Sequence, residues 1–363
     1  MPRPRTVYHG KRKYSWIITL AVTLLVVVIL LAVWLFYYLQ RFIVYDKEGL
    51  RLDLSAPREE LLSSDGGSPA AQPAFTPVDV EIVVEQRDYS DVVTSAGTDL
   101  VPLKAVFVPA AELNENTLKY YASDMGDFNA LVLELKGPDG FLRWHSRAEL
   151  ADSFAVNGTT ELNDAVAALK EKGVYLAAQL CALTDGAMAQ RNAPIALKTA
   201  SGEVFTEANG YGCLDPYSDG TRSYLHSLLT ELSVMGFDEV FLSGFLCPDS
   251  PDLRFSLART QTPTPTEAVT SLALWLRQEA DTLGLKLSVV MESDALRSGD
   301  TVLHGQDAAL LFRVFDRVAA ATDFDHLPGD LSALDAALEQ PDENRALLIT
   351  DNYAPERQSY IVR

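Results

Sequence analysis

The sequence predicts an α/β fold, a (β/α)8 barrel of the TIM type that is complete or lacks one strand, preceded by one transmembrane helix. Short β-rich runs alternate with helical segments from residue 103 onward, the pattern of a parallel sheet covered by helices. About 285 residues follow residue 77, and such barrels commonly have about 250. An uncharged run over residues 15–40 predicts the membrane helix.

The run 15–40 contains no charged residue, no glycine and no proline. A helix needs about 20 apolar residues to cross a hydrocarbon core of ~30 Å, so this run is long enough. Five basic residues precede it, which favours a cytoplasmic tail over residues 1–14 and an extracytoplasmic remainder. A cleaved signal peptide would have an apolar core of only ~7–15 residues. A buried core helix is the other alternative. We expect an uncleaved, single-pass anchor in the cell membrane.

Residues 41–77 form a juxtamembrane segment and a linker, and residues 78–363 form the extracytoplasmic domain. The linker part, SSDGGSPAAQPAFTP, lacks apolar periodicity and is typical of a flexible tether. Residues 1–41 carry six Lys and Arg and no acid, which leaves 24 basic and 50 acidic residues, a formal charge of −26. Such a charge makes nucleic acid and anionic lipid headgroups poor partners.

Seven strands can be counted in the domain, with helices between them. The predicted strands are 103–109, 130–136, 174–183, 239–245, 285–291, one within the weaker repeat 307–321, and 346–350. The predicted helices are 112–125, 161–172, 218–235, 267–283 and 331–339. Residues 80–84 (VEIVV) are the candidate for an eighth strand. A doubly wound open sheet is the alternative, but the first strand is followed by Pro109-Ala110 and not by a glycine-rich nucleotide loop.

Four stretches of the domain, in order and spacing, are similar to a known family. They are KAVFVPA with LVLELKGPDG, then IALKTASGEVF, LDPYS and GFDEV. In these stretches the chain resembles an uncharacterised bacterial family of proposed glycoside hydrolases with a (β/α)8 barrel. The resemblance covers about 210 of 363 residues. It implies a glycoside-hydrolase-like domain directed at cell-wall or surface carbohydrate, such as the glycan of peptidoglycan.

The chain departs from the family pattern at positions that the resemblance implies are catalytic. Ser243 stands where the family has a strand-end Asp, and Leu246 stands where it has Arg. Gln179 replaces another Arg, and Val290 stands near a further Asp. A serine cannot transfer a proton as a carboxylate does, so the departures leave open whether the protein is an enzyme.

Glu134 and Glu292 are the predicted catalytic pair, because glycoside hydrolysis normally needs two carboxyl groups and both residues lie at predicted strand ends. Lys136 shares the face of Glu134 in a regular strand and would favour its ionised form. The alternatives are an internal Glu134–Lys136 ion pair and a solvated loop beginning at Glu292.

Lys136, Trp144, Gln179 and Asp215 are the predicted substrate-binding residues. Trp144 follows a turn near the predicted mouth and could lie against a sugar face, although core packing explains it equally well. The first interpretation of Asp215, in the stretch LDPYS, is that it marks the start of a helix. Cys181, Cys213 and Cys247 are too few for a disulfide framework and do not have metal-ligand spacing, so we expect neither a metal site nor a cofactor.

Three functions are consistent with these patterns. The favoured one is a degenerate barrel that binds a polysaccharide without efficient hydrolysis. The second is an active glycoside hydrolase with a relocated pair such as Glu134 and Glu292. The third is a structural envelope domain that interacts with proteins, which would have no open groove.

Overall fold

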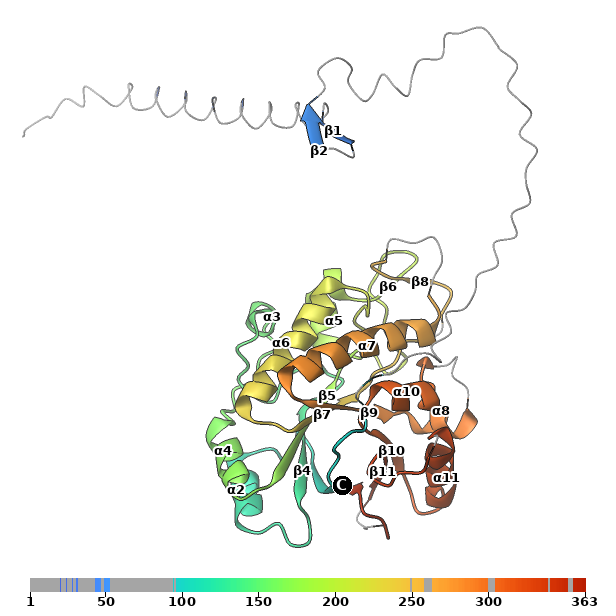
Figure 1. Ribbon diagram of the computed structural model, residues 1–363. Coiled ribbons are helices and arrows are strands. Elements are labelled where there is room, and N and C mark those ends of the chain that lie inside the picture. The colour runs from blue at the N-terminus through green and yellow to red at the C-terminus, as the bar shows by residue number, and fades with distance from the viewer. Residues whose placement is uncertain are drawn as a thin grey trace, which may run out of the picture. The chain divides into compact units, whose positions relative to one another are not determined.

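The computed structural model describes most of the chain from residue 94 onward and short parts before it (Figure 1). The described residues are 94, 96–248, 250–257, 263–299, 304–338, 340–351 and 355–363, with 43–46, 49–52 and four single residues further upstream. The chain divides into two units, Met1–Val83 and Val84–Arg363.

The N-terminal unit has one described hairpin, in which β1 (Ile43–Asp46) pairs antiparallel with β2 (Gly49–Leu52). In the run 15–40, the four described residues are helical and more than half exposed: Leu20, Leu24, Val28 and Leu31. The rest of that run, the linker and the candidate strand 80–84 lie outside the described residues. None of the helices that the structure describes has both the length and the apolar character needed to cross a bilayer.

The second unit contains a closed barrel of eight parallel strands, which confirms the predicted barrel (Figure 1). The strands, in their order around the barrel, are β3 (Lys104–Val108), β4 (Ala130–Lys136), β5 (Tyr175–Cys181), β7 (Glu239–Ser243), β9 (Lys286–Met291), β10 (Val318–Thr322), β11 (Ala346–Thr350) and β12 (Tyr360–Val362). β12 pairs with both β11 and β3 and so supplies the eighth strand. The prediction that residues 80–84 would supply it is wrong. Three residues are too few to show a periodic pattern.

Helices follow the strands and cover the outside of the barrel. The longer ones are α2 (Glu115–Ser123), α4 (Asn163–Glu171), α6 (Asp219–Met235), α7 (Pro265–Leu283), α10 (Ala308–Val314) and α11 (Leu327–Ala337). The shorter ones are α3 (Glu149–Ser153), α5 (Gly186–Arg191), η3 (Ala193–Ile195) and α8 (Ser293–Ser298). α7 begins where Thr264 accepts a hydrogen bond from the Glu267 backbone at 3.1 Å, and it ends at Gly284, whose φ is +69°. These are the expected signals at the two ends of a helix.

Each barrel strand buries both of its faces. On β4, Leu131, Leu133 and Leu135 pack in the layer between strands and helices, whereas Ala130 and Val132 point into the barrel. Alanines and a few larger side chains fill the interior: Ala105, Ala130, Val132, Ala177, Phe241, Ala319, Leu347, Ile349 and Ile361. The interior is therefore a packed core, and ligands are left to its ends.

A buried polar network closes the end of the barrel where the strands begin. Glu239 and Arg317 are both 0% exposed, and Arg317 Nε donates to Glu239 Oε2 at 3.2 Å. Glu239 also accepts from the hydroxyls of Tyr175, at 2.9 Å, and of Ser288. Burial and the neighbouring carboxylate raise the pKa of Tyr175, so the phenol keeps its proton and donates. Every charge in this floor thus has a partner, as buried charges require.

Closure by β12 gives a prediction for stability. Ile361 is 1% exposed and packs in the interior. Ile361→Asp places an unpaired carboxyl there and should cost several kcal/mol of unfolding free energy, because a buried charge without a partner loses its hydration. Urea unfolding of the full chain measures this loss. Ile361→Val is the matched control and should cost about 0.5–1.5 kcal/mol. Equal losses in the two variants would contradict the interior position of this residue.

Candidate active site at the barrel mouth

The mouth is the end of the barrel at which the strands terminate. The inward-facing residues there are partly exposed, unlike those deeper in the barrel: Phe107, Glu134, Gln179, Ser243, Val290, Glu292 and Ala321. Active sites of such barrels form at this end. The structure therefore brings Glu134, Gln179 and Glu292, all predicted site residues, to one face of the domain.

Glu292 follows β9 directly and precedes α8. Its backbone N–H donates to Gln306 Oε1 at 2.8 Å, and the buried Gln306 donates from Nε2 to the Phe245 carbonyl at 3.0 Å. Burial raises the pKa of the Glu292 carboxyl, and the acidic neighbours Asp294 and Glu207 raise it further, while His304 opposes them. A partly exposed carboxyl with a raised pKa is the usual form of a general acid.

Glu134 lies across the mouth from Glu292 and has different surroundings. Its Oε2 accepts a hydrogen bond from the Ala110 backbone N–H, at 2.8 Å, just beyond the end of β3. The strands β4 and β9 are three steps apart in the barrel. At ~4.8 Å for each step, roughly 14 Å of wall separates them.

Lys136 does not share the face of Glu134, and this corrects the sequence prediction. The β4–β5 ladder shifts its register between them, so that Glu134 pairs with Gln179 and Lys136 pairs with Leu180. Leu180 packs in the outer layer. A bulge of this kind places an extra residue in one strand and turns the following side chain to the other face. Lys136 is therefore 0% exposed and outside the mouth.

Lys136 pairs with Asp185 and not with Glu134. The distance from Nζ to Asp185 Oδ2 is 2.9 Å, and Nζ also donates to the Cys181 carbonyl. Asp185 caps α5, because its Oδ1 accepts from the Met188 backbone at 2.8 Å. Gly140, with a φ of +82°, leaves room for this carboxylate, since a Cβ there would lie 1.9 Å from Asp185 Oδ1. The pair thus fixes the loops after β4 and β5 to each other.

Two other predicted binding residues lie in the interior of the protein. Trp144 is 1% exposed and packs in the layer between strands and helices, so its ring cannot meet a ligand at the mouth. Asp215 is also 1% exposed, and its oxygens accept from the backbones of Tyr217, at 2.9 Å, and Ser256. Both corrections have one cause: a position shortly after a strand does not distinguish a buried loop anchor from a mouth residue.

Glu207 is a partly exposed mouth residue that the sequence analysis missed. It belongs to the long loop between β5 and α6, and it acts electrostatically on Glu292. Glu207 does not follow a predicted strand end, because it lies on a loop that extends away from the barrel. The preceding Gly202 and following Gly210 mark its turns, but no sequence signal places those turns over the mouth.

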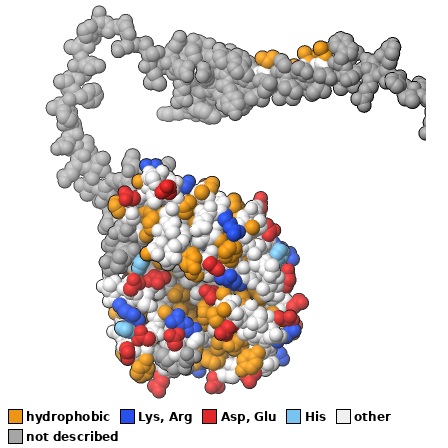
Figure 2. All heavy atoms as spheres, turned by 180° about the vertical axis from the view of Figure 1, so that it is seen from behind, with side chains coloured by type: hydrophobic (Ala, Val, Ile, Leu, Met, Phe, Trp, Pro, Cys, Tyr) orange, Lys and Arg blue, Asp and Glu red, His pale blue; other side chains and the backbone are white. Residues whose placement is uncertain are grey.

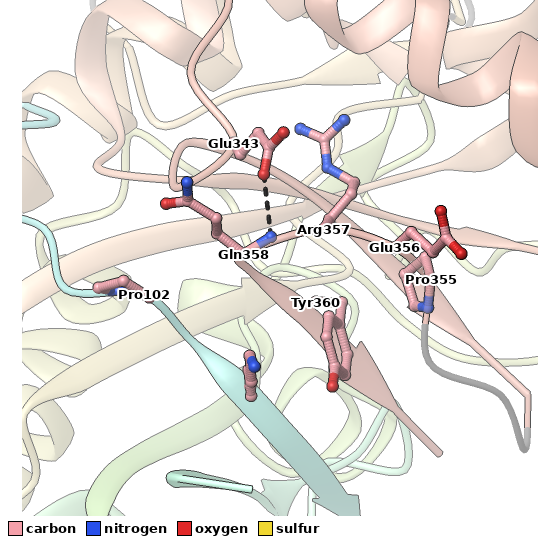
Figure 3. A pocket seen from close by; sticks show the side chains of 8 residues that line it. Pro102, Glu343, Pro355, Glu356, Arg357, Gln358 and Tyr360 are labelled. Atoms are coloured by element: carbon pink, nitrogen blue, oxygen red, sulfur yellow. Dashed lines mark hydrogen bonds between the residues drawn. The ribbon is translucent and has the colours of Figure 1, made fainter. Parts of the chain in front are cut away.

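Two pockets lie at the opposite end of the domain. One pocket has a volume of about 650 Å³ and lies where β3 and β12 begin (Figure 3). Its lining residues are Pro102, Lys104, Glu343, Pro355, Glu356, Arg357, Gln358 and Tyr360. Glu343 accepts from the Gln358 backbone there at 2.9 Å. In barrels of this type that end serves stability. One face of the unit shows acidic side chains interspersed with basic and apolar ones (Figure 2).

Comparison with known families assigns the domain. Residues 105–326 match the family described as "Putative glycosyl hydrolase domain". This match spans more than half of the chain, so the chain belongs to that family. No curated protein sequence matches it.

Solved structures resemble the chain at low sequence identity, and the first of those that follow shares its fold. The glycoside hydrolase domain of PgaB (BpsB) from Bordetella bronchiseptica is 14% identical with a TM-score of 0.52, over 72% of this chain and 93% of that one. A hypothetical protein from Ruminiclostridium thermocellum is 18% identical with a TM-score of 0.45, over 51% and 96%. The glycoside hydrolase domain of PelA from Pseudomonas aeruginosa is 20% identical with a TM-score of 0.40, over 69% and 84%.

The Lys136–Asp185 pair gives a second prediction. Lys136→Met leaves Asp185 buried without a partner and should lower the unfolding free energy by about 3–5 kcal/mol. Lys136→Met combined with Asp185→Asn removes both charges and should recover much of this loss. Urea unfolding of the wild type and both variants provides the measurement. A double variant no more stable than the single one would show that the charge of Asp185 is not the cause.

Proposed function

We propose that the domain hydrolyses a glycosidic bond of a polysaccharide held at the barrel mouth, with Glu292 as the general acid. The observation that carries this proposal is the state of Glu292. Glu292 directly follows β9, remains partly exposed, and has a carboxyl pKa raised mainly by burial. Membership of the glycosyl hydrolase family supports the reaction class.

The reaction requires Glu292 to be protonated before the bond breaks. Its proton passes to the glycosidic oxygen, so that the sugar leaves as an alcohol while positive charge develops at the anomeric carbon. A second carboxylate must be ionised to stabilise that charge, or to activate the water that attacks it. Among the described residues, Glu134 and Glu207 are the candidates for this role that we consider.

A second candidate function is carbohydrate binding without efficient cleavage. The observation in its favour is that Ser243 and Gln179, both partly exposed at the mouth, are neutral. Neutral hydrogen-bonding groups can orient sugar hydroxyls without supplying a proton. The same mouth would then hold a polysaccharide such as the glycan of peptidoglycan.

The proposed location is the outer face of the cell membrane. The uncharged run 15–40, with basic residues before it, supports a single-pass anchor with its N-terminus in the cytoplasm. The linker over residues 63–77 would then let the barrel reach carbohydrate beyond the bilayer.

Replacing Glu292 tests the catalytic assignment. Glu292→Gln should lower kcat for release of reducing sugar by about 10²–10⁴-fold, because the amide has no proton to donate to the leaving oxygen. The assay uses the full chain with peptidoglycan and soluble bacterial polysaccharides. Glu203→Gln, on an exposed loop residue, is the control and should retain wild-type activity. An active Glu292→Gln variant would overturn the assignment, and polysaccharide binding without release in the wild type would favour the second function.

The pH dependence has a defined sign. Because burial raises the pKa of Glu292, the protonated and active form persists to higher pH than for an exposed glutamate. The activity should therefore fall as pH rises through this raised pKa. The pH profile of kcat/KM for the wild type measures that descending limb.

Deleting residues 15–40 tests the anchor. The full chain should sediment with membranes and need detergent for release, whereas the deletion variant should remain in the soluble fraction after export by an added signal peptide. Extraction of the full chain by alkaline carbonate or high salt alone would contradict a membrane span.

A further inference from the structure

The loop that carries Glu207 is folded against the barrel by short ladders. Cys213 bridges to Thr184, just beyond β5, and Thr206 bridges to Gly212. β6 (Lys198–Thr199) in the same loop pairs with β8 (Leu253–Arg254) from the loop after β7. The loop is therefore attached to the ends of two neighbouring barrel strands.

Glu207 begins the tight turn at the tip of this loop. Its backbone N–H donates to the Tyr211 carbonyl, and its carbonyl accepts from the Gly210 N–H, both at 2.9 Å. Gly210 has a φ of +88°, which a turn requires and which glycine adopts without strain. These two hydrogen bonds close the turn, and the Glu207 side chain lies beside Cys213.

Three donors hold the carboxylate of Glu207. Thr184 Oγ1 and Cys213 Sγ donate to Oε1 at 3.2 and 3.3 Å, and Asn209 Nδ2 donates to Oε2 at 2.8 Å. Burial and the Glu207 carboxylate raise the pKa of Cys213, so the thiol keeps the proton that it donates. The carboxylate is thus oriented by its neighbours and still partly exposed to solvent.

Glu207 and Glu292 are each linked, through one intermediate residue, to one of two adjacent residues just beyond β7. Thr184, which donates to Glu207, also donates its backbone N–H to the Gly244 carbonyl at 3.2 Å. Gln306, which accepts from the Glu292 backbone, donates to the carbonyl of the next residue, Phe245. A short chain of hydrogen bonds therefore leads from each of the two glutamates to the segment Gly244-Phe245. The side-chain hydrogen bond described for Glu134 goes elsewhere, to the Ala110 backbone just beyond β3.

We propose that Glu207 is the second carboxylate of the active site, working with Glu292 in place of Glu134. This inference rests on the hydrolysis proposed above. The loop supplies an acid that is linked through Thr184 to Gly244, just beyond the end of β7, and that strand end itself carries no carboxyl group.

The step is balanced by one water molecule. Glu292 gives its proton to the glycosidic oxygen and the bond from the anomeric carbon to that oxygen breaks. Water adds to the anomeric carbon, and Glu207 takes the proton that the water loses. Exchange with solvent returns the two carboxyl groups to their starting states. Since donors already occupy both oxygens of Glu207, we assign it the role of base toward water and not that of nucleophile.

Chemical labelling tests the pairing without a substrate. A water-soluble carbodiimide with an amine labels protonated carboxyl groups, and peptide mass spectrometry gives the labelled fraction of Glu292 against pH in the full chain. The charged groups around Glu292 are Glu207, Asp294 and His304. Glu207→Gln removes a negative neighbour, so the midpoint for Glu292 should move to lower pH. Glu134→Gln and the control Glu203→Gln should leave it unchanged. A shift in Glu134→Gln and none in Glu207→Gln would overturn the inference.

Activity separates this inference from the proposed function. Glu207→Gln should lower kcat on the cleaved polysaccharide by about 10²-fold or more, as expected for loss of a general base, and the control Glu203→Gln should retain wild-type activity. Thermal unfolding confirms that each variant is folded. If Glu292→Gln is active, the proposed function fails. If Glu292→Gln and Glu134→Gln are inactive while Glu207→Gln is active, the hydrolase stands and the role of Glu207 is refuted.

Discussion

Closure of the barrel is the constraint on which the arrangement of the mouth depends. Eight parallel strands meet only because β12, three residues long, pairs with both β11 and β3. The junction is reinforced by Ser359, whose Oγ accepts from the Leu103 backbone at 2.8 Å and donates to Asn344. Parallel strands that close into a ring end at one rim, so residues from distant parts of the sequence become neighbours there. Without closure the sheet would be open, and Glu134 and Glu292 would lie at separate strand ends that do not surround a common mouth.

The two ends of the barrel use charge in opposite ways. At the floor, Glu239 and Arg317 are fully buried, and each finds hydrogen-bonding partners, so that these charges stabilise one packing of the barrel. At the mouth, Glu134, Glu207 and Glu292 remain partly exposed, and Glu292 is held near other acids. A network in which every charge has a partner makes the structure rigid. A cluster with an excess of carboxyl groups keeps one of them protonated, and that group can donate its proton in a reaction.

Most of the scaffold could be predicted from the sequence, because each repeated strand–helix unit has apolar residues at regular spacing that pack into one continuous core. The predicted strands 130–136 and 346–350 have the observed bounds. The missed features depend on single residues and not on patterns. β12 is too short to show a periodic pattern. The bulge before Lys136 turns this side chain to the face opposite the one that strict alternation along the strand predicts. Glu207 reaches the mouth through a loop, and loop paths are set by tertiary contacts such as the Thr184–Cys213 bridge.

The late position of β12 in the chain has a consequence for how the domain is made. The contact between Leu103 and Ser359 spans 256 residues, so it cannot form until nearly the whole domain has emerged from the ribosome. Until then β3 and β11 each present an unpaired edge that can recruit another strand. Contacts of such long range also form slowly, because the loop between them must be closed first. Nascent chains would therefore be most vulnerable to aggregation just before residue 360 appears, and factors that shield strand edges would act in that interval.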